Sequence, residues 1–425
     1  FSHYNITTKI IILTKDLLVI ITTNNHLKKN FFLTFKAKEK ITEYLSKPGA
    51  VFYIGFDPTA DSLHIGHLTQ MMVMAHMQKA GHIPIALMGG GTGRIGDPSG
   101  RSDMRQLMTT ETINHNVEKF KEQMTRLIDF SDDKAIIANN ADWLLNINYI
   151  EFLRDIGVNF SVNKMLATDI YKNRLEDGLT YFEFSYILLQ SYDFLELFRR
   201  YHCRLQMGGQ DQWANIISGV DLIRRVEQEE AYGMTFKLLE NSAGEKMGKT
   251  AKGALWLDAD KLSPFEFYQY FRNMEDASVI KTMKILTFLP LEEIAKYEKL
   301  EGQEINQAKE VLAYEVTKIV HGEEAASDAQ KQARQLFSGA GRSDNMPTYE
   351  LTEDEAFNTA ILDLLSTNKM VPSKSEGRRL IKQGGVYLND IAIPHPNALM
   401  NANAFKNNEV IIRRGKKNFF RFILK

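Results

Sequence analysis

Residues 50–67 read AVFYIGFDPTADSLHIGH and set the start of the fold. The first seven are mostly β-branched or aromatic and lie between KPG and DP, a pattern typical of a buried strand. Residues 66–79 predict a helix, because Leu68 and Met71 recur at helical spacing before a glycine. Residues 83–90, IPIALMGG, predict a second buried strand. A strand, a helix and a strand with short connections form a parallel crossover unit, so we predict an α/β fold with a doubly wound, Rossmann-like parallel sheet.

The rest of the chain divides into further segments. Residues 203–216, CRLQMGGQDQWANI, read as a strand, a glycine turn and a helix, so the sheet resumes there. We infer no function from the first segment, which contains no methionine. The predicted segments are an atypical N-terminal segment at 1–46, a Rossmann-like domain at 47–262 with a helical insertion at about 109–200, a helical domain at 263–337, a linker at 338–360 and a small basic α+β domain at 361–425.

Charge is distributed unevenly along the 425 residues, although the formal net charge is only -1. Residues 369–425 hold twelve Lys or Arg against three acids, a local balance of +9, which leaves -10 for the remainder. A basic end on a mildly acidic protein favours a polyanion partner over a merely solvated basic surface.

The composition excludes several classes of protein. Cys203 is the single cysteine, so the chain can form no intramolecular disulfide and no cysteine-rich zinc site. The most apolar run, at residues 9–21, is broken by Lys15 and Asp16 and is too short to span a bilayer. We therefore predict a cytoplasmic protein with no membrane partner. An organellar presequence is disfavoured, because the first forty residues contain no arginine.

His64 and His67 lie where the first strand meets the following helix. A metal site is disfavoured, since no third ligand at metal-binding spacing lies nearby, and we predict no bound metal. A purely structural role is the usual one for an isolated histidine. At a helix N-terminus, however, unpaired backbone N–H groups and the helix dipole attract anions, which favours polyphosphate binding. Gly66 has no side chain, so a base or a ribose can lie against the helix backbone.

A second phosphate-binding element is expected, because an enzyme that forms an adenylate must also neutralise the leaving pyrophosphate. Residues 244–253, GEKMGKTAKG, supply Lys246, Lys249 and Thr250 on a glycine-flanked loop. Alone, such a loop is more often a surface turn. Combined with the histidine pair about 180 residues earlier, it is a specific indication of adenylate chemistry.

Together these elements resemble the two signature motifs of the class I aminoacyl-tRNA synthetases, and HIGH at residues 64–67 matches the first letter for letter. The second motif departs from its usual form, because Gly248 and Thr250 stand where serines are usual. The stretches YIGFDPTADSLHIGH, GGGTGRIGDPSG, YFEFSYILLQSYDF and QMGGQDQW are similar to the tyrosyl enzymes of bacterial type. This resemblance covers about residues 47–425.

The resemblance implies a tyrosine pocket with a polar floor. Tyr53 and Asp193 would hold the phenol hydroxyl, and a substrate without that hydroxyl would leave both groups buried and unpaired. Rejection of phenylalanine by this enzyme class is a worked example in general accounts of specificity. The other tyrosine-binding residues implied are Asp97, Tyr186 and Gln190 for the ammonium group and Gln212 near the carboxylate.

The same resemblance implies residues for ATP and for catalysis. The catalytic positions are Thr59, His64, His67, Lys246, Lys249 and Thr250. The ATP-binding positions are Gly55, Asp57, Gly66, Gly209 and Asp211, with Arg101 and Arg105 as basic candidates for pyrophosphate or the tRNA acceptor end. Magnesium would arrive with ATP, without dedicated protein ligands.

The basic end has its own resemblance. Residues 371–390, VPSKSEGRRLIKQGGVYLND, are similar to a small RNA-binding module that also occurs in ribosomal and pseudouridine-forming proteins. Basic side chains on a short helix and the strand after it suit phosphate contacts on folded RNA. The candidate RNA-binding residues are Lys374, Arg378, Arg379, Lys382, Arg413 and Arg414.

As a whole, the resemblance implies a homodimeric ligase that uses ATP to form tyrosyl-adenylate, releases AMP and pyrophosphate, and esterifies the 3′ end of tRNA(Tyr). Two alternatives remain open. The sister enzyme for tryptophan would leave Tyr53 and Asp193 facing an indole that has no hydroxyl. A non-catalytic RNA-binding or splicing helper on the same fold would not need both ATP motifs together.

Overall fold

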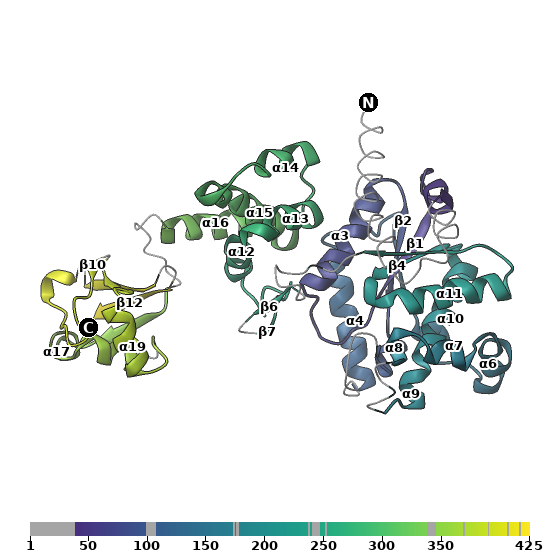
Figure 1. Cartoon of the computed structure of the whole chain (residues 1–425), viewed down its shortest axis with the longest axis horizontal. Coiled ribbons are helices and arrows are strands. Elements are labelled where there is room, and N and C mark those ends of the chain that lie inside the picture. The colour runs from purple at the N-terminus through teal and green to yellow at the C-terminus, as the bar shows by residue number, and fades with distance from the viewer. Residues whose placement is uncertain are drawn as a thin grey trace. The chain divides into compact units, whose positions relative to one another are not determined.

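The structure is a computed structural model that describes residues 39–98, 108–172, 175, 178–236, 239, 247–250, 253–337, 346–368, 370–389, 391–405, 408–415 and 418–425. The chain divides into two compact units between Ser327 and Asp328. The unit before this point contains a parallel sheet and a group of helices, and the unit after it contains a second sheet (Figure 1).

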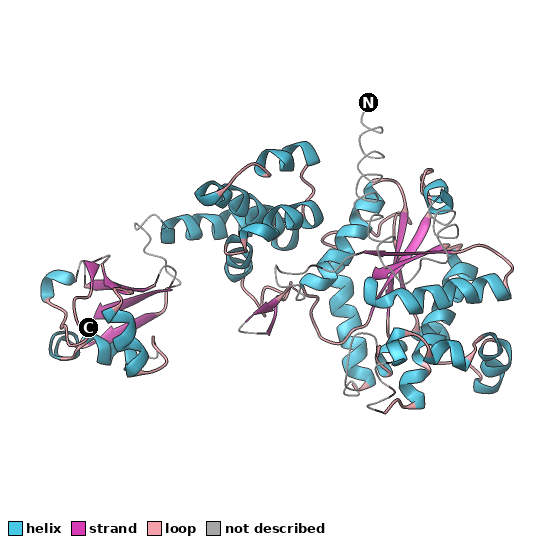
Figure 2. Cartoon of the chain, viewed as in Figure 1, coloured by secondary structure: helices cyan, strands magenta, loops and turns pink. Residues whose placement is uncertain are grey.

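A five-stranded parallel sheet forms the centre of the first unit, as predicted. Its strands lie in the order β3-β2-β1-β4-β5, so the chain crosses over on both sides of β1. Figure 2 shows the strands with helices packed around them. This order confirms the doubly wound, Rossmann-like fold, and it creates a switch point at the carboxyl ends of β1 and β4. The strands are β1 Val51–Phe56, β2 Ile83–Met88, β3 Ile136–Asn139, β4 Leu205–Gly209 and β5 Tyr232–Phe236.

Helix α3, Ile65–Lys79, connects β1 to β2 and buries its apolar face, including Leu68 and Met71. Helix α11, Trp213–Val226, follows β4 after the 3-10 turn η4, Gln210–Gln212. Both helices therefore begin at the switch point, which is where the sequence placed the two strand-to-helix transitions.

The predominantly helical stretch predicted at about 109–200 contains one strand, β3, which pairs in parallel with β2. Its four residues, IIAN, are too few to show a strand period, so this strand could not be predicted from the sequence. The helices of this stretch are α4 Thr110–Met124, α5 Ala141–Leu144, α6 Tyr149–Asp155, α7 Val162–Leu166, α8 Asp169–Lys172, α9 Tyr181–Phe184 and α10 Tyr186–Tyr201, with the 3-10 turn η3 Gly157–Asn159.

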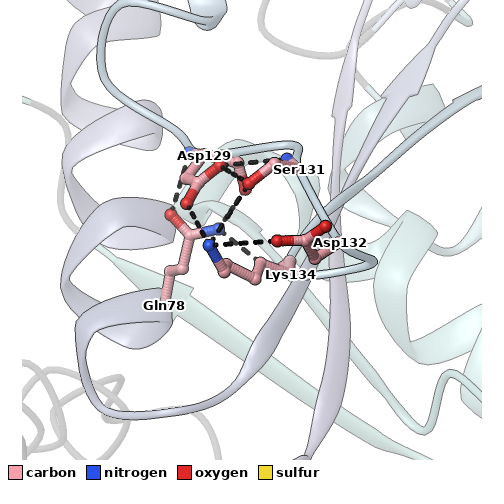
Figure 3. Close-up of polar contacts among 5 residues, drawn as sticks. All are labelled: Gln78, Asp129, Ser131, Asp132 and Lys134. Carbon is pink, nitrogen blue, oxygen red and sulfur yellow. Dashed lines mark hydrogen bonds and ion pairs between the residues drawn. The ribbon is translucent and has the colours of Figure 1, made fainter.

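A polar cluster fixes the loop between α4 and β3 against the end of α3 (Figure 3). Gln78 Nε2 donates hydrogen bonds to the carbonyl oxygens of Asp129 (2.7 Å) and Lys134 (3.1 Å). The Asp129 carboxylate accepts hydrogen bonds from Ser131 Oγ (2.6 Å) and Lys134 Nζ (2.9 Å). These hydrogen bonds, of which that from Ser131 has the largest effect, hold the pKa of Asp129 well below its usual range. The loop is thus braced where the chain enters β3.

The first unit continues through a short hairpin into a helical region. The hairpin pairs β6, Lys249–Thr250, with β7, Gly253–Ala254. The helical region contacts the sheet domain through Lys79, whose Nζ lies 3.1 Å from the centre of the Phe288 ring, and through Arg126 Nη1, which donates to the Val320 carbonyl (3.3 Å). The helices after the hairpin are α12 Pro264–Arg272, α13 Asp276–Leu286, α14 Leu291–Tyr297 and α15 Ile305–His321, with the 3-10 turn η5 Gly302–Glu304. Helix α16, Glu323–Phe337, contains the point at which the two units divide.

The second unit is an α+β fold whose sheet has the strand order β10-β9-β11-β12-β8. Strand β8 and helix α17 lie within the predicted linker at 338–360. Leu351 is buried in the core, and β8 pairs in parallel with β12. The elements are β8 Thr348–Leu351, α17 Glu353–Asn358, α18 Ile361–Thr367, α19 Lys374–Lys382, β9 Val386–Leu388, β10 Ile391–Ala392, η6 Ala402–Ala404, β11 Glu409–Arg414 and β12 Asn418–Leu424.

None of the helices within the described ranges combines the length and the apolar character needed to cross a bilayer.

Candidate active site

A cavity of about 500 Å³ opens at the carboxyl ends of β1 and β4. It is the switch-point crevice in which doubly wound sheets bind ligands. Residues from β1, α3, α10 and the η4 turn line it together, although they are far apart in the sequence. The predicted residues that line the cavity are Tyr53, Gly55, Asp57, Thr59, His64, Gly66, His67, Asp97, Tyr186, Gln190, Asp193, Gly209, Asp211 and Gln212.

Some predicted residues fall outside this picture. Arg101, Arg105 and Lys246 lie outside the described residues, and for Lys249 and Thr250 only the backbone is described. The six candidate RNA-binding residues all belong to the second unit.

His64 and His67 form an interlocked cap at the start of α3. The Gly66 N–H donates to Nδ1 of His64 (3.1 Å), and the His64 N–H donates to Nδ1 of His67 (3.2 Å). The two rings stack, with centroids 3.9 Å apart. Since both Nδ1 atoms accept hydrogen bonds, we assign the ring proton of each neutral imidazole to Nε2. The pair therefore carries two N–H donors at a helix N-terminus.

Burial keeps this pair neutral. It lowers the pKa of His64, and it lowers the pKa of His67 well below its ordinary value, with the neighbouring His64 adding to the effect. Both groups are consequently uncharged near pH 7. They can donate hydrogen bonds to a phosphate without repelling each other, and positive charge for a polyphosphate has to come from other residues.

Tyr53 and Asp193 form the floor of the cavity. The Tyr53 hydroxyl is buried and has no hydrogen-bond partner within the described residues. Asp193 lies on α10, 2% exposed, and its two carboxylate oxygens accept hydrogen bonds from Trp143 Nε1 (2.7 Å) and Asn140 Nδ2 (2.8 Å). An unpaired hydroxyl beside a fully buried carboxyl is a site prepared for a polar ligand group.

Opposing effects determine the pKa of the Asp193 carboxyl. Burial raises the pKa of its carboxyl to about 8, while the hydrogen bonds from Asn140 and Trp143 act in the opposite direction by favouring the ionised form. The carboxyl therefore titrates near neutral pH, and the two donors determine how readily it accepts a hydrogen bond from a ligand.

Asn140 and Trp143 are functional candidates that the sequence analysis missed. They belong to the short segment NNADW after β3, where neither residue is part of a recognisable motif. Asn140 also accepts from the Gly91 N–H (2.7 Å) and donates to Thr92 Oγ1 (2.9 Å). It therefore ties the glycine-rich loop to the cavity floor, a relation that appears only once β3 is paired with β2.

A chain of amides and acids lines the cavity wall beside the floor. Gln212 Nε2 donates to Asp97 Oδ2 (2.6 Å), and Gln190 Nε2 donates to Gln212 Oε1 (3.3 Å). The Tyr186 hydroxyl donates to Asp57 Oδ2 (3.3 Å). These residues all line the cavity, and the buried Oε1 of Gln190 has no hydrogen-bond partner within the described residues, so the wall offers acceptor oxygens suited to an ammonium group.

Gly248, the departure from the usual second motif, has a clear structural reason. Its φ is +103°, a conformation that favours glycine. A Cβ at this position would lie 2.1 Å from Ile65 Cγ2 of the HIGH segment. A serine would therefore not fit in this geometry, and the lost hydroxyl is exchanged for close contact between the two motifs.

In the second unit, most of the candidate RNA-binding cations already have partners. Lys374 pairs with Asp363 (2.8 Å), Arg379 pairs with Glu376 (2.7 Å), Arg413 lies 3.7 Å from the Tyr387 ring centre and Arg414 donates to the Met370 carbonyl. Arg378 and Lys382 are exposed, lie one turn apart on α19 and have no ion pair among the described residues. These two are the best placed to meet phosphate.

The fold, the donor pair at the α3 N-terminus and the switch-point cavity define a class I aminoacyl-tRNA synthetase. Residues 46–338 match the family model described as tRNA synthetases class I (W and Y). Residues 339–422 match the model described as the tyrosine–tRNA ligase SYY-like C-terminal domain.

Full-length relatives narrow the class to one specificity. The tyrosine–tRNA ligase of Acetivibrio thermocellus is 58% identical over 395 residues, which cover 93% of this chain and 97% of the relative. That of Caldanaerobacter subterraneus subsp. tengcongensis is 56% identical over 398 residues, covering 94% and 98%. The chain belongs to the tyrosine–tRNA ligase family.

A solved structure agrees with this assignment. The C-terminally truncated mitochondrial tyrosyl-tRNA synthetase of Aspergillus nidulans superposes with a TM-score of 0.63 at 29% identity and covers 76% of this chain and 99% of its own.

Replacing Trp143 with Phe should weaken tyrosine binding. The change keeps an aromatic ring but removes the N–H that donates to Asp193, so the pKa of Asp193 should rise further above its ordinary value. We expect the Kd for tyrosine to rise about tenfold, the order of one hydrogen bond to a charged group, with the Kd for ATP unchanged. Equilibrium dialysis with each ligand measures both constants.

Trp213→Phe is the matched control, because this tryptophan is 39% exposed and belongs to the start of α11. It should leave tyrosine binding unaltered. An unchanged tyrosine Kd in Trp143→Phe would contradict the role given to the indole N–H.

Proposed function

We propose that this protein joins tyrosine to tRNA(Tyr) in two steps, through a tyrosyl-adenylate. The observation that carries the proposal is that one cavity contains two different sets of polar groups, one at each end. The cavity floor contains the unpaired Tyr53 hydroxyl beside Asp193. The N-terminus of α3 carries the neutral donors His64 and His67. The first end suits a phenol and the second suits a phosphate, as the activation of tyrosine requires.

Selection of tyrosine would take place at the floor. A phenol hydroxyl can both donate and accept, so it can pair with the Tyr53 hydroxyl and with the Asp193 carboxyl. Phenylalanine would bury both groups without partners, which is unfavourable. Tryptophan offers no hydroxyl there either, and its larger ring would have to fit between Tyr53 and the glycine-rich loop.

The substrate's ammonium group would lie against the acceptors of the cavity wall. Asp97 and Gln190 are the candidate partners, together with the Tyr186 hydroxyl. Gln212, which bridges Asp97 and Gln190, would hold these acceptors in place and lie near the substrate carboxylate. This arrangement would direct the carboxylate toward the start of α3, where the phosphates are expected.

Activation would proceed by attack of the tyrosine carboxylate on the α-phosphorus of ATP, with breakage of the bond to pyrophosphate. A carboxylate is already a nucleophile, so the step needs no protein base, and catalysis consists of positioning and charge stabilisation. His64 and His67 would donate to phosphate oxygens, with Thr59 beside them. The cations Lys246 and Lys249, with Thr250, would stabilise the charge on the leaving pyrophosphate.

ATP would lie against the same switch point. Gly55, Gly66 and Gly209 leave room for the nucleotide, and Asp211 would accept a hydrogen bond from a ribose hydroxyl, with Asp57 nearby. Magnesium would enter as part of the ATP substrate. Within the described residues, no cluster of three or more His, Cys, Asp or Glu side chains could hold a metal ion. Arg101 and Arg105 are further candidates for pyrophosphate or the acceptor end.

In the second step a ribose hydroxyl of the terminal tRNA nucleotide would attack the tyrosyl carbonyl and release AMP. The second unit would bind the tRNA through phosphate contacts. Arg378 and Lys382 on α19 are the leading candidates, because their exposed charges have no internal ion pair among the described residues. Lys374, Arg379, Arg413 and Arg414 would contribute mainly by shaping this surface.

We further propose that the protein works as a cytoplasmic homodimer. The insertion after β3 carries a set of exposed apolar side chains, which is unusual for a surface that only meets water. A second copy of the chain is the occupant consistent with the resemblance stated above. The side chains, with their exposed fractions, are Tyr149 57%, Ile150 70%, Val158 75%, Val162 55% and Tyr181 62%.

The experiment that tests the function is tyrosine-dependent exchange of pyrophosphate into ATP. Wild-type protein should exchange with tyrosine and far more slowly with phenylalanine or tryptophan. Tyr53→Phe removes one of the polar groups that phenylalanine leaves unpaired, so the ratio of kcat/KM for tyrosine over phenylalanine should fall about tenfold or more. An unchanged ratio would assign Tyr53 a structural role, and no exchange by wild-type protein would refute the function.

Removal of the second sheet and its helices should separate the two half-reactions. A chain that ends before Met346 retains all the cavity-lining residues but loses the +9 balance of residues 369–425. We expect pyrophosphate exchange to persist, tRNA charging to fall steeply and the salt dependence of tRNA binding to flatten, because fewer phosphates are neutralised. Exchange, aminoacylation and filter binding at several salt concentrations measure these effects. Charging at the full-length rate would show that the second unit is not the RNA-binding element.

Charged substitutions in the insertion should separate the subunits. Ile150→Glu combined with Val158→Glu places two carboxylates on the exposed apolar surface, and burying them against a partner would be strongly unfavourable. Light scattering after size-exclusion chromatography should show a dimer for wild-type protein and a monomer for the variant. Ile391→Glu, at a 74% exposed residue of the second unit, should remain dimeric. A dimeric double variant would place the interface elsewhere.

A further inference from the structure

Gly248 is held on three sides by contacts that join the two ATP motifs. Its N–H donates a hydrogen bond to the Tyr270 hydroxyl (3.1 Å), and its carbonyl accepts one from the Leu255 N–H (2.7 Å). The absence of a side chain lets it pack on Ile65 of the HIGH segment. The residue is buried and immediately precedes Lys249. Its backbone therefore fixes where the β6 strand begins.

The same region is tied to the start of α3 by backbone hydrogen bonds. The Ile65 N–H donates to the Leu255 carbonyl (3.0 Å), and the Leu257 N–H donates to the Leu63 carbonyl (2.9 Å). His64 also forms an isolated bridge with Trp256. Residues 255–257 thus connect the histidine pair to Gly248 through backbone hydrogen bonds. A shift of Gly248 would therefore change the relative position of the two motifs.

Tyr270 contacts this arrangement from a helix outside both motifs. It lies on α12, and its ring packs edge-on against Phe271 with centroids 5.3 Å apart. Burial raises the pKa of its hydroxyl, so the group stays protonated and neutral near pH 7. Tyr270 does not line the cavity. It can affect the reaction only through the backbone that it holds.

A buried backbone N–H is almost always paired, because leaving it unpaired is unfavourable. Within the described residues, the hydroxyl of Tyr270 is the partner of the Gly248 N–H. If the hydroxyl were absent, the chain would gain by turning Gly248 toward another acceptor or toward water. Either movement would break the contact with Ile65 or the hydrogen bond with Leu255.

We propose that Tyr270 is a positioning residue for tyrosine activation, whose hydroxyl holds Gly248 and thereby sets the backbone position of Lys249 relative to the histidine pair. The inference rests on the proposed function. Lys249 would meet charge that develops on the pyrophosphate in the transition state, so a displaced backbone should slow the chemical step. The tyrosine floor, which is built on β1 and α10, does not depend on this contact.

Tyr270→Phe tests the proposal, because it retains the ring against Phe271 and removes only the acceptor. In single-turnover experiments with saturating ATP, the rate constant for adenylate formation should fall about tenfold, the effect of one lost hydrogen bond. The Kd for tyrosine and the rate of transfer from preformed adenylate to tRNA should stay unchanged. Trypsin should also cleave after Lys249 more rapidly in the unliganded variant.

Two further variants keep the result interpretable. Gly248→Ala leaves Tyr270 intact but cannot keep φ near +103° beside Ile65, so it should show the same loss of rate with unaltered tyrosine binding. Tyr314→Phe is the matched control, because its hydroxyl bonds to Glu323 instead, and it should behave as wild type.

A normal activation rate and normal trypsin cleavage in Tyr270→Phe would overturn the proposal. So would equal losses of tyrosine affinity and rate together with a lower melting temperature, because that pattern marks a general structural role. Failure of the proposed function is distinguishable: the wild-type protein would then show no tyrosine-dependent exchange, while the trypsin comparison would still report on the contact between Tyr270 and Gly248.

Discussion

Parallel pairing of β1 with β2 on one side and β4 on the other is the constraint on which the site depends. Because the chain leaves β1 in one direction and returns through β4 in the other, the helices that follow these strands begin side by side. The N-terminus of α3 and the η4 turn before α11 therefore face one crevice. This strand order brings together cavity-lining residues that are far apart in the sequence.

The crevice is prepared for its ligand by polar groups that the protein leaves unpaired. The Tyr53 hydroxyl and the Oε1 atoms of Gln190 and Gln206 are buried without a partner within the described residues. Such groups are unfavourable in a folded protein unless a ligand satisfies them. Asp193 differs from these groups, because Asn140 and Trp143 already donate hydrogen bonds to its oxygens and oppose the rise in pKa that burial causes. The cavity thus combines buried polar groups that lack hydrogen-bond partners with one carboxyl group, Asp193, that already accepts two hydrogen bonds.

Under the proposed function, the histidine pair would bind phosphate at the start of α3. Burial keeps both imidazoles neutral, and their interlocked Nδ1 acceptors leave Nε2–H groups as donors at the start of α3. Donors without charge can lie 3.9 Å apart, ring centre to ring centre, without mutual repulsion. The positive charge that a polyphosphate requires would then come from the lysine motif, in which Gly248 packs directly against Ile65. Division of these tasks between two segments makes their relative position critical.

The sequence by itself determined the doubly wound fold, the two motifs proposed to bind ATP and about half of the residues that line the cavity. Apolar runs bounded by glycine and proline are local signals, and the motifs occur as contiguous letters. It did not show β3, which is four residues long, or β8, Thr348–Leu351, which joins the second sheet by pairing in parallel with β12. Both strands are short and depend on partners far along the chain.

Only the tertiary structure decided which residues support the site. Asn140 and Trp143 reach Asp193 because β3 pairs with β2 and brings the NNADW segment under α10. From the sequence, Gly248 means only that a hydroxyl is missing. The structure shows that its positive φ and its close contact with Ile65 require a glycine there. The charge of the C-terminal residues predicted a polyanion partner, but ion pairs within the unit determined which cations remain available. Local sequence encodes local conformation, whereas hydrogen-bond partners, burial and pKa shifts arise from contacts between distant segments.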